Sequence, residues 1–150
     1  MALTGDFSRL QELRQRLGKL VNGGFAKQAA TALANQTQQN IIDGFNAKRD
    51  PYGRPWAPRR PVPDWVVRAF HPTNHPLLDK SGKMIDTAKS KAVGLKIRVS
   101  MKPYAKFHQD GTIKMVARKL VPDGANLGPI WGAAYLRVSA NLARQLMGLA

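Results

Sequence analysis

Prolines divide this chain into two unequal parts. Seven of its ten prolines lie between Lys48 and Pro76, namely Pro51, Pro55, Pro58, Pro61, Pro63, Pro72 and Pro76. Each proline lacks a backbone N–H and fixes φ, so no regular helix or strand is expected to continue through this stretch. We therefore predict one domain over residues 1–150, with an extended, proline-rich and basic loop at about residues 48–76.

The loop contains signals for a turn, for anchoring and for contact with other molecules. Asp50-Pro51-Tyr52-Gly53 is a favourable turn sequence. Trp56 and Trp65 are expected to attach the loop to the body, and a short helix is expected near Asp64 to Phe70. An interface arm is predicted from the loop's cations and one tryptophan, namely Arg54, Trp56, Arg59 and Arg60.

Two helices are predicted before the loop, over Asp6 to Val21 and over Phe25 to Phe45. The first has a stripe of leucines at helical spacing, at positions 10, 13, 17 and 20, which is typical of a core or partner-helix contact. The second has small and apolar residues on one side. Its polar side is mostly uncharged, which suits a subunit interface; it holds Asn35, Gln36, Gln39 and Asn40.

Leu77 to Met101 is predicted to be a β-hairpin that turns at Gly94. In its second strand the apolar residues Leu95, Ile97, Val99 and Met101 alternate with Lys96, Arg98, Ser100 and Lys102. This period of two predicts one apolar face and one basic face. The first strand, about Lys83 to Val93, adds two cations. The predicted contact for DNA or an acidic partner is therefore Lys89, Lys91, Lys96, Arg98 and Lys102.

The C-terminal part is predicted to hold a turn or short helix, a strand and a long helix. The short piece covers Tyr104 to His108, and the strand covers Lys114 to Leu120. Pro129 suits the first turn of a last helix that ends near Met147. Its apolar face, with Trp131 and Tyr135, is expected to pack on the hairpin. The fold class is α+β, with N-terminal helices, a proline-rich arm and a small antiparallel sheet packed against helices.

Charge and composition limit the possible functions. Lys and Arg total 24 against 9 Asp and Glu, a net charge of +15, which implies a polyanionic partner or acidic neighbours. Cysteine is absent, which excludes disulfides and cysteine-based zinc sites. His71 and His75 have metal-ligand spacing on a helix, but the proline after each argues against a helix, so no metal site is predicted. Neither a signal peptide nor a membrane span is expected.

An enzyme is the last of the hypotheses. His108 and Asp110 could serve a nuclease, but no nucleophile motif accompanies them. A metal-dependent nuclease needs clustered acidic ligands, and the acidic residues here are scattered. Glu12 is the single glutamate, which argues against a carboxylate-pair hydrolase. We predict no catalytic residue and no cofactor, and we assign His108 to fixing a turn.

The segment from Tyr104 to Pro122 resembles the signature of the phage virion morphogenesis family. That signature is YA-x-x-HQ-x-G followed by P-x-R-x-φ-L, where φ is apolar. The matching residues here are Tyr104, Ala105, His108, Gln109, Gly111 and Arg118. Val116 stands where the family usually has proline. The run Asp50 to Trp56 is also similar to a family segment, and so is Lys80 to Met84.

The resemblance implies a non-enzymatic virion protein of the phage neck. Such a protein acts in tail completion or head–tail joining, as part of a homo-oligomeric ring around the DNA channel. Its partners would be other neck, portal or connector, or tail proteins, with no membrane contact. Nonspecific contact with DNA is a further option. Assembly would take place in the host cytoplasm. The alternative is a sequence-independent nucleic-acid-binding protein of another kind, which the charge supports without a recognisable motif.

Overall fold

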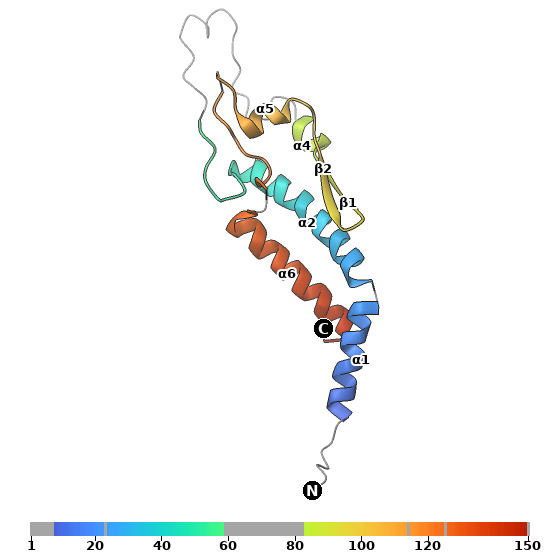
Figure 1. The fold of residues 1–150 in the computed structure, drawn as a ribbon. Coiled ribbons are helices and arrows are strands. Elements are labelled where there is room, and N and C mark those ends of the chain that lie inside the picture. The colour runs from blue at the N-terminus through green and yellow to red at the C-terminus, as the bar shows by residue number, and fades with distance from the viewer. Residues whose placement is uncertain (1–7, 23, 59–82, 114, 125, 150) are drawn as a thin grey trace, which may run out of the picture.

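The central element of the computed structural model is a long helix, α2 (Phe25–Ala47), with other elements on two of its sides. The structure describes residues 8–22, 24–58, 83–113, 115–124 and 126–149. The C-terminal helix α6 (Gly128–Met147) lies along one side of α2, and a two-stranded hairpin lies along the other (Figure 1). Helices and a small antiparallel sheet share one body, so the predicted α+β class is confirmed.

Small residues let α2 accept neighbours on two sides. Ala30, Ala34 and Thr37 are buried along its middle, whereas the larger Ile41 and Phe45 fill the core toward its C-terminal end. Short side chains bring backbones close together, while large ones supply buried apolar area. The helix ends at Lys48, whose φ of 52° lies in the left-handed region. The predicted second helix is therefore confirmed, and it extends two residues further, to Ala47.

The hairpin consists of β1 (Lys89–Val93) and β2 (Lys96–Ser100), paired antiparallel. Gly94, with φ of 62°, lies in its turn, as predicted. Gln38 of α2 holds β1 in place, because its side-chain amide donates to the Ala88 carbonyl at 2.7 Å and accepts from the Ser90 N–H at 2.8 Å. A two-stranded hairpin is marginally stable alone, so its attachment to α2 contributes to its stability.

Two strand predictions were wrong. The first half of the predicted strand Lys83 to Val93 is a short helix, α4 (Lys83–Thr87), which brings Met84 and Ala88 into the core at a helical spacing of four. Lys114 to Leu120 is not a strand either: in its described residues the only pairing is an isolated bridge between Thr112 and Met115. Backbone groups of that segment bond to α5 (Ala105–Asp110) instead.

The predicted packing of the last helix on the hairpin was also wrong. Pro129 does lie in the first turn of α6, and the helix does end at Met147. However, α6 packs on α2, which separates it from the strands (Figure 1). Tyr135 confirms this contact, since its hydroxyl lies 2.5 Å from the hydroxyl of Thr37. Because α2 buries two sides, it covers both the hairpin and α6, and they need not cover each other.

The core lies at the C-terminal end of α2, where most segments of the body meet. It is formed by Ile41, Phe45, Trp56, Met84, Ala88, Ala105, Leu120 and Trp131. Trp56 is 8% exposed and packs edge-on against Phe45, with ring centroids 5.4 Å apart. The start of the proline-rich loop is therefore attached to the body, as predicted. Trp65, the expected helix at 64–70 and the two histidines at 71 and 75 lie outside the described residues.

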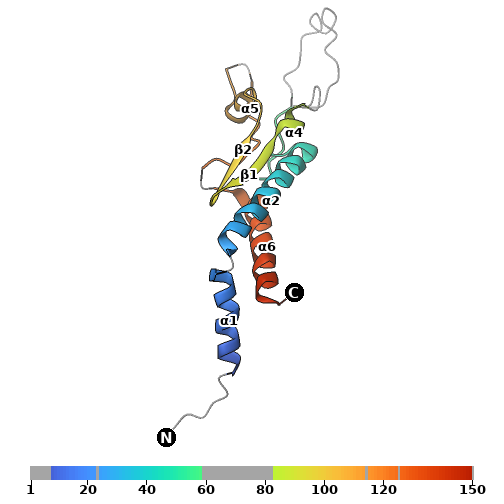
Figure 2. The same cartoon turned by 90° about the vertical axis from the view of Figure 1, so that its right-hand side faces the viewer.

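Helix α1 (Ser8–Asn22) extends away from this body (Figures 1 and 2). It confirms the predicted first helix, but its leucine stripe does not enter the core. Leu10, Leu13 and Leu17 are 60%, 50% and 48% exposed. Within the described residues, no helix combines the length and the apolar character that crossing a bilayer requires.

We expect the substitution Trp131→Ala to lower the free energy of unfolding by about 3–5 kcal/mol, because the indole is 4% exposed within the core cluster. Leu136→Ala, at a 74% exposed position of the same helix, is the matched control and should change stability by less than about 0.5 kcal/mol. Urea unfolding of both variants measures the difference. Equal effects would contradict the placement of Trp131 in the core.

Candidate functional site

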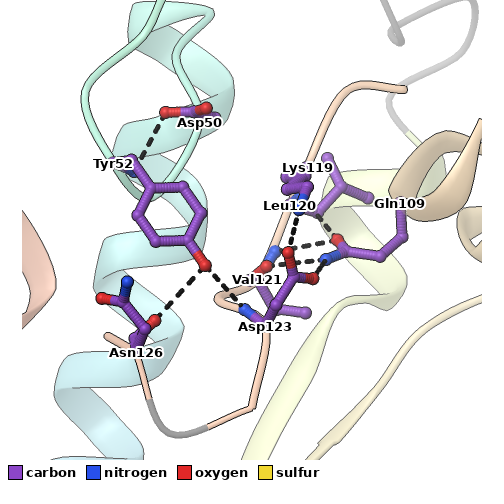
Figure 3. Close-up of polar contacts among 8 residues, drawn as sticks. All are labelled: Asp50, Tyr52, Gln109, Lys119, Leu120, Val121, Asp123 and Asn126. Atoms are coloured by element: carbon purple, nitrogen blue, oxygen red, sulfur yellow. Dashed lines mark hydrogen bonds and ion pairs between the residues drawn. The ribbon is translucent and has the colours of Figure 1, made fainter. Parts of the chain in front are cut away.

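Gln109, in the segment from Tyr104 to Pro122, joins α5 to residues 120–123 like a clamp (Figure 3). Its Oε1 accepts hydrogen bonds from the backbone N–H of Leu120 at 2.8 Å and of Val121 at 3.1 Å. Its Nε2 donates to the Val121 carbonyl at 2.7 Å and to the Asp123 carboxylate at 3.1 Å. Gln109 thus gives a segment without a strand partner some of the bonds that a strand would supply.

An amide side chain suits this position, because one end of it accepts and the other donates. A carboxylate could accept the two N–H groups but could not donate to Val121 and Asp123, and an ammonium could donate but not accept. An apolar residue would leave backbone groups beside the buried Leu120 without partners. The chemistry of the clamp therefore gives Gln109 a structural role.

Arg118 is buried and connects the same segment to the proline-rich loop. Its Nε donates to the Ala57 carbonyl at 2.9 Å and its Nη2 to the Pro58 carbonyl at 3.1 Å. Its backbone N–H donates to the carbonyl of His108 at 2.6 Å. A guanidinium can serve several acceptors in one plane, so a single side chain fixes the loop at Ala57 and Pro58 against the body.

Gly111 provides the close approach between α5 and this segment. Its φ is +77°, and a Cβ on it would lie 2.9 Å from the backbone nitrogen of Ala117. Both the left-handed conformation and the missing side chain are needed here. Ala105 is buried in the core, while Tyr104 is partly exposed. The structure therefore brings Gln109, Gly111 and Arg118 together around one connection, and Ala105 and His108 adjoin it.

A second set of polar contacts fixes the turn that follows α2 (Figure 3). The Asp50 carboxylate accepts from the backbone N–H of Tyr52 and of Arg54, at 2.9 and 2.8 Å. The Tyr52 hydroxyl accepts from the N–H of Asp123 at 3.0 Å and donates to the Asn126 carbonyl at 3.3 Å. The predicted turn is confirmed, and it is fastened to the segment that Gln109 holds.

His108 lies in a partly buried position beside Arg118. Its Nδ1 is buried and has no hydrogen-bond partner among the described residues. Burial, with a smaller contribution from the positive charge of Arg118, lowers the pKa of His108 below its usual value of about 6.5. The described residues contain no cluster of three potential metal ligands.

The cations predicted on the hairpin lie on its exposed face. Lys89, Lys91, Lys96 and Arg98 are exposed, whereas the alternating Ser90, Ala92, Ile97 and Val99 are partly covered. Lys91 is directly opposite Arg98 in the register, and Lys89 is opposite Ser100. Lys102, just after β2, is exposed as well. Leu95, expected in the apolar row, lies in the turn and is 73% exposed.

These cations have no acidic partner within the described chain. The ion pairs that the described residues form are Arg16 with Glu12 and Lys119 with Asp123. Like charges directly opposite each other on paired strands repel. The geometry therefore suits an external anion over this face.

The predicted interface arm is only partly described. Arg54 is exposed, but Trp56 is a core residue and is therefore not available to a partner; Arg59 and Arg60 lie outside the described residues. Sequence reasoning missed the roles of Gln38, Tyr52 and Asp123. Asn40, assigned to a polar interface face, is buried and accepts a hydrogen bond from Gln36. Nothing in the local sequence of Gln38, Tyr52 or Asp123 signals a partner so distant along the chain.

The site and the fold define a small α+β protein with a fixed polar connection and an exposed basic hairpin. Comparison with known families matches residues 8–149 to the phage virion morphogenesis family. The match covers almost the whole chain, so the chain belongs to this family. No curated protein and no solved structure matches it. Membership supports a structural role in building the phage particle, and association with the virion.

We expect Gln109→Leu to lower the free energy of unfolding by about 1–3 kcal/mol, because it leaves backbone groups of residues 120 and 121 without partners. Gln145→Leu, at an exposed position of α6, is the matched control and should be nearly neutral. Chemical denaturation measures both. If the two variants were equally stable, the clamp would not hold the segment.

His108 should make the protein less stable as pH falls below about 6.5. The unfolded chain then binds a proton at this histidine that the folded state resists, so the unfolded state gains stability until the lower, folded pKa is reached. His108→Gln removes this difference. Unfolding at pH 7.5 and 5.5 should show a larger loss for the original chain than for the variant. Parallel losses would contradict the expectation.

Proposed function

We propose that this protein acts in tail completion or head–tail joining, as a subunit of a ring at the phage neck. The observation that carries the proposal is the exposed row of cations on the hairpin of a virion morphogenesis protein. The neck is where a structural protein would meet both neighbouring proteins and the DNA that passes between head and tail. A basic surface that forms no ion pair with the described residues suits that position.

The hairpin is supported in a way that would present its cations to a large anion. Gln38 fixes the start of β1, and Val99 packs against the core, so the strands are held on the inner side. The opposite face is left to Lys91, Arg98 and their neighbours. We propose that this face lines the lumen and meets DNA phosphates. Such contacts would be independent of sequence, and few enough to let DNA slide.

The role we propose is non-enzymatic. Two residues of the family signature, Gln109 and Arg118, form structural hydrogen bonds within the body. A sequence-independent nucleic-acid-binding protein outside the neck would use the same basic face. Cryo-EM of the virion neck separates these two possibilities, because a neck protein is found there as a ring and the alternative is not.

The triple variant Lys96→Glu, Arg98→Glu and Lys102→Glu tests the lumen. In phage carrying it, incorporation of the protein into particles is measured by quantitative mass spectrometry, and DNA retention by nuclease-protected DNA per particle. We expect normal incorporation and reduced DNA retention, because reversed charges repel phosphate. Binding of the purified original protein to DNA should weaken with salt, with a log–log slope of about 0.9 per phosphate neutralised.

The control is Lys27→Glu, Arg137→Glu and Arg144→Glu, which changes net charge equally at exposed positions away from the hairpin. It should leave DNA retention unchanged. Lost incorporation of the hairpin variant alone would assign the face to an acidic neighbouring subunit instead. If the hairpin variant behaved like the control in both assays, the face would be merely solvated and the proposal wrong.

A further inference from the structure

Helix α1 has an apolar stripe that its own chain leaves largely uncovered. Leu10, Leu13 and Leu17 follow spacings of three and four, and Leu20 continues the pattern. The first three are about half exposed, and Val21 beside them is 82% exposed. Figures 1 and 2 show why: α1 contacts the C-terminal end of α6 but reaches beyond the ends of α2 and α6, so the body covers only part of its length.

A helix of 15 residues with so little support needs a partner to persist. Isolated helices of this length are marginal in water, and most helical stability in proteins comes from packing of an apolar face. The stripe has the a and d spacing of a coiled-coil seam, with Leu10 and Leu17 at a and Leu13 and Leu20 at d. The geometry of the stripe thus suits a second helix lying along it.

The charges beside the stripe indicate which kind of helix could pack on it. The positions that flank such a seam decide which helices pair, and here they are held by Arg9, Arg14, Arg16 and Val21. Arg14 is exposed. Arg16 is engaged with Glu12, in an exposed pair that contributes little. No acidic residue stands at a flanking position, because Glu12 lies further round the helix.

A second copy of this chain fits the stripe poorly. Pairing two copies of α1 would bring flanking arginines together with no acid at a flanking position, and Glu12 pairs only with Arg16 of its own helix. Each copy also has a net charge of +15. An acidic helix would instead bring carboxylates to Arg14 and Arg16. We propose that α1 docks an acidic amphipathic helix of another protein, with leucine-like residues at a and d and Asp or Glu beside them.

This surface is separate from the basic hairpin, and the inference does not depend on a position at the neck. It is tested on the full purified chain with three labelled heptad peptides, by fluorescence anisotropy. One peptide has Leu at a and d with Glu at e and g. The second replaces those Glu with Lys, and the third replaces the Leu of the acidic peptide with Ser. We expect only the acidic leucine peptide to bind well.

The double variant Leu13→Asn and Leu17→Asn should weaken that binding at least about tenfold, because it removes two apolar contacts from the seam. Arg14→Glu should weaken it too, and the loss should shrink at high salt. Leu136→Asn, at an exposed leucine of α6, is the matched control and should bind normally. All these positions are exposed, so unfolding transitions should stay close to that of the original chain.

Three results would overturn the proposal. The first is equal binding of the acidic leucine peptide and either of the other two. The second is acidic-peptide binding that survives the double leucine variant. The third is self-association of the chain in sedimentation velocity that the double variant abolishes, since this would make a second copy the occupant of the stripe.

Discussion

The structure depends on the burial of α2 on two sides at once. Its C-terminal half supplies Ile41 and Phe45 to the core, and that core also receives Trp56, Met84, Leu120 and Trp131 from segments far apart in the chain. Each of these segments is short or irregular. Since a two-stranded hairpin or a single turn of helix is marginal alone, their stability comes from this common contact with α2.

Polar side chains supply hydrogen bonds to a backbone segment that passes beside the apolar core. The segment at 117–123 has no strand partner, yet its backbone is bonded through Gln109, the His108 carbonyl and Tyr52. Buried backbone groups without partners are costly, so these few side chains decide whether the segment can pass beside the core. Gln109 and Arg118 of the family signature thus hold the chain in an irregular path, and Gly111 lets α5 approach it closely.

Local patterns in the sequence predicted single helices, strands and turns better than they predicted which of these elements pack together. The leucine spacing, the turn at Asp50 to Gly53 and the alternation in β2 each depend on residues close in sequence, and each was confirmed. The helix α4 was missed because five residues hold too little periodicity to separate helix from strand. The pairing of α6 with α2 was missed because both the hairpin and α2 offered a plausible apolar surface. The clamp by Gln109 joins residues whose side chains carry no mark of their partner, so only the six motif positions could be predicted, and not their bonds.

The position of α2 between the hairpin and α6 gives the protein two faces that point in opposite directions (Figure 1). If identical subunits are related by rotation about one axis, a face that is turned toward the axis in one subunit is turned toward it in all. If the hairpin faced the axis, α6 of every subunit would lie on the outer surface of the ring. The inner and outer surfaces of such a ring would then come from different elements. Substitutions on the hairpin would alter only the inner surface, and substitutions on α6 only the outer one.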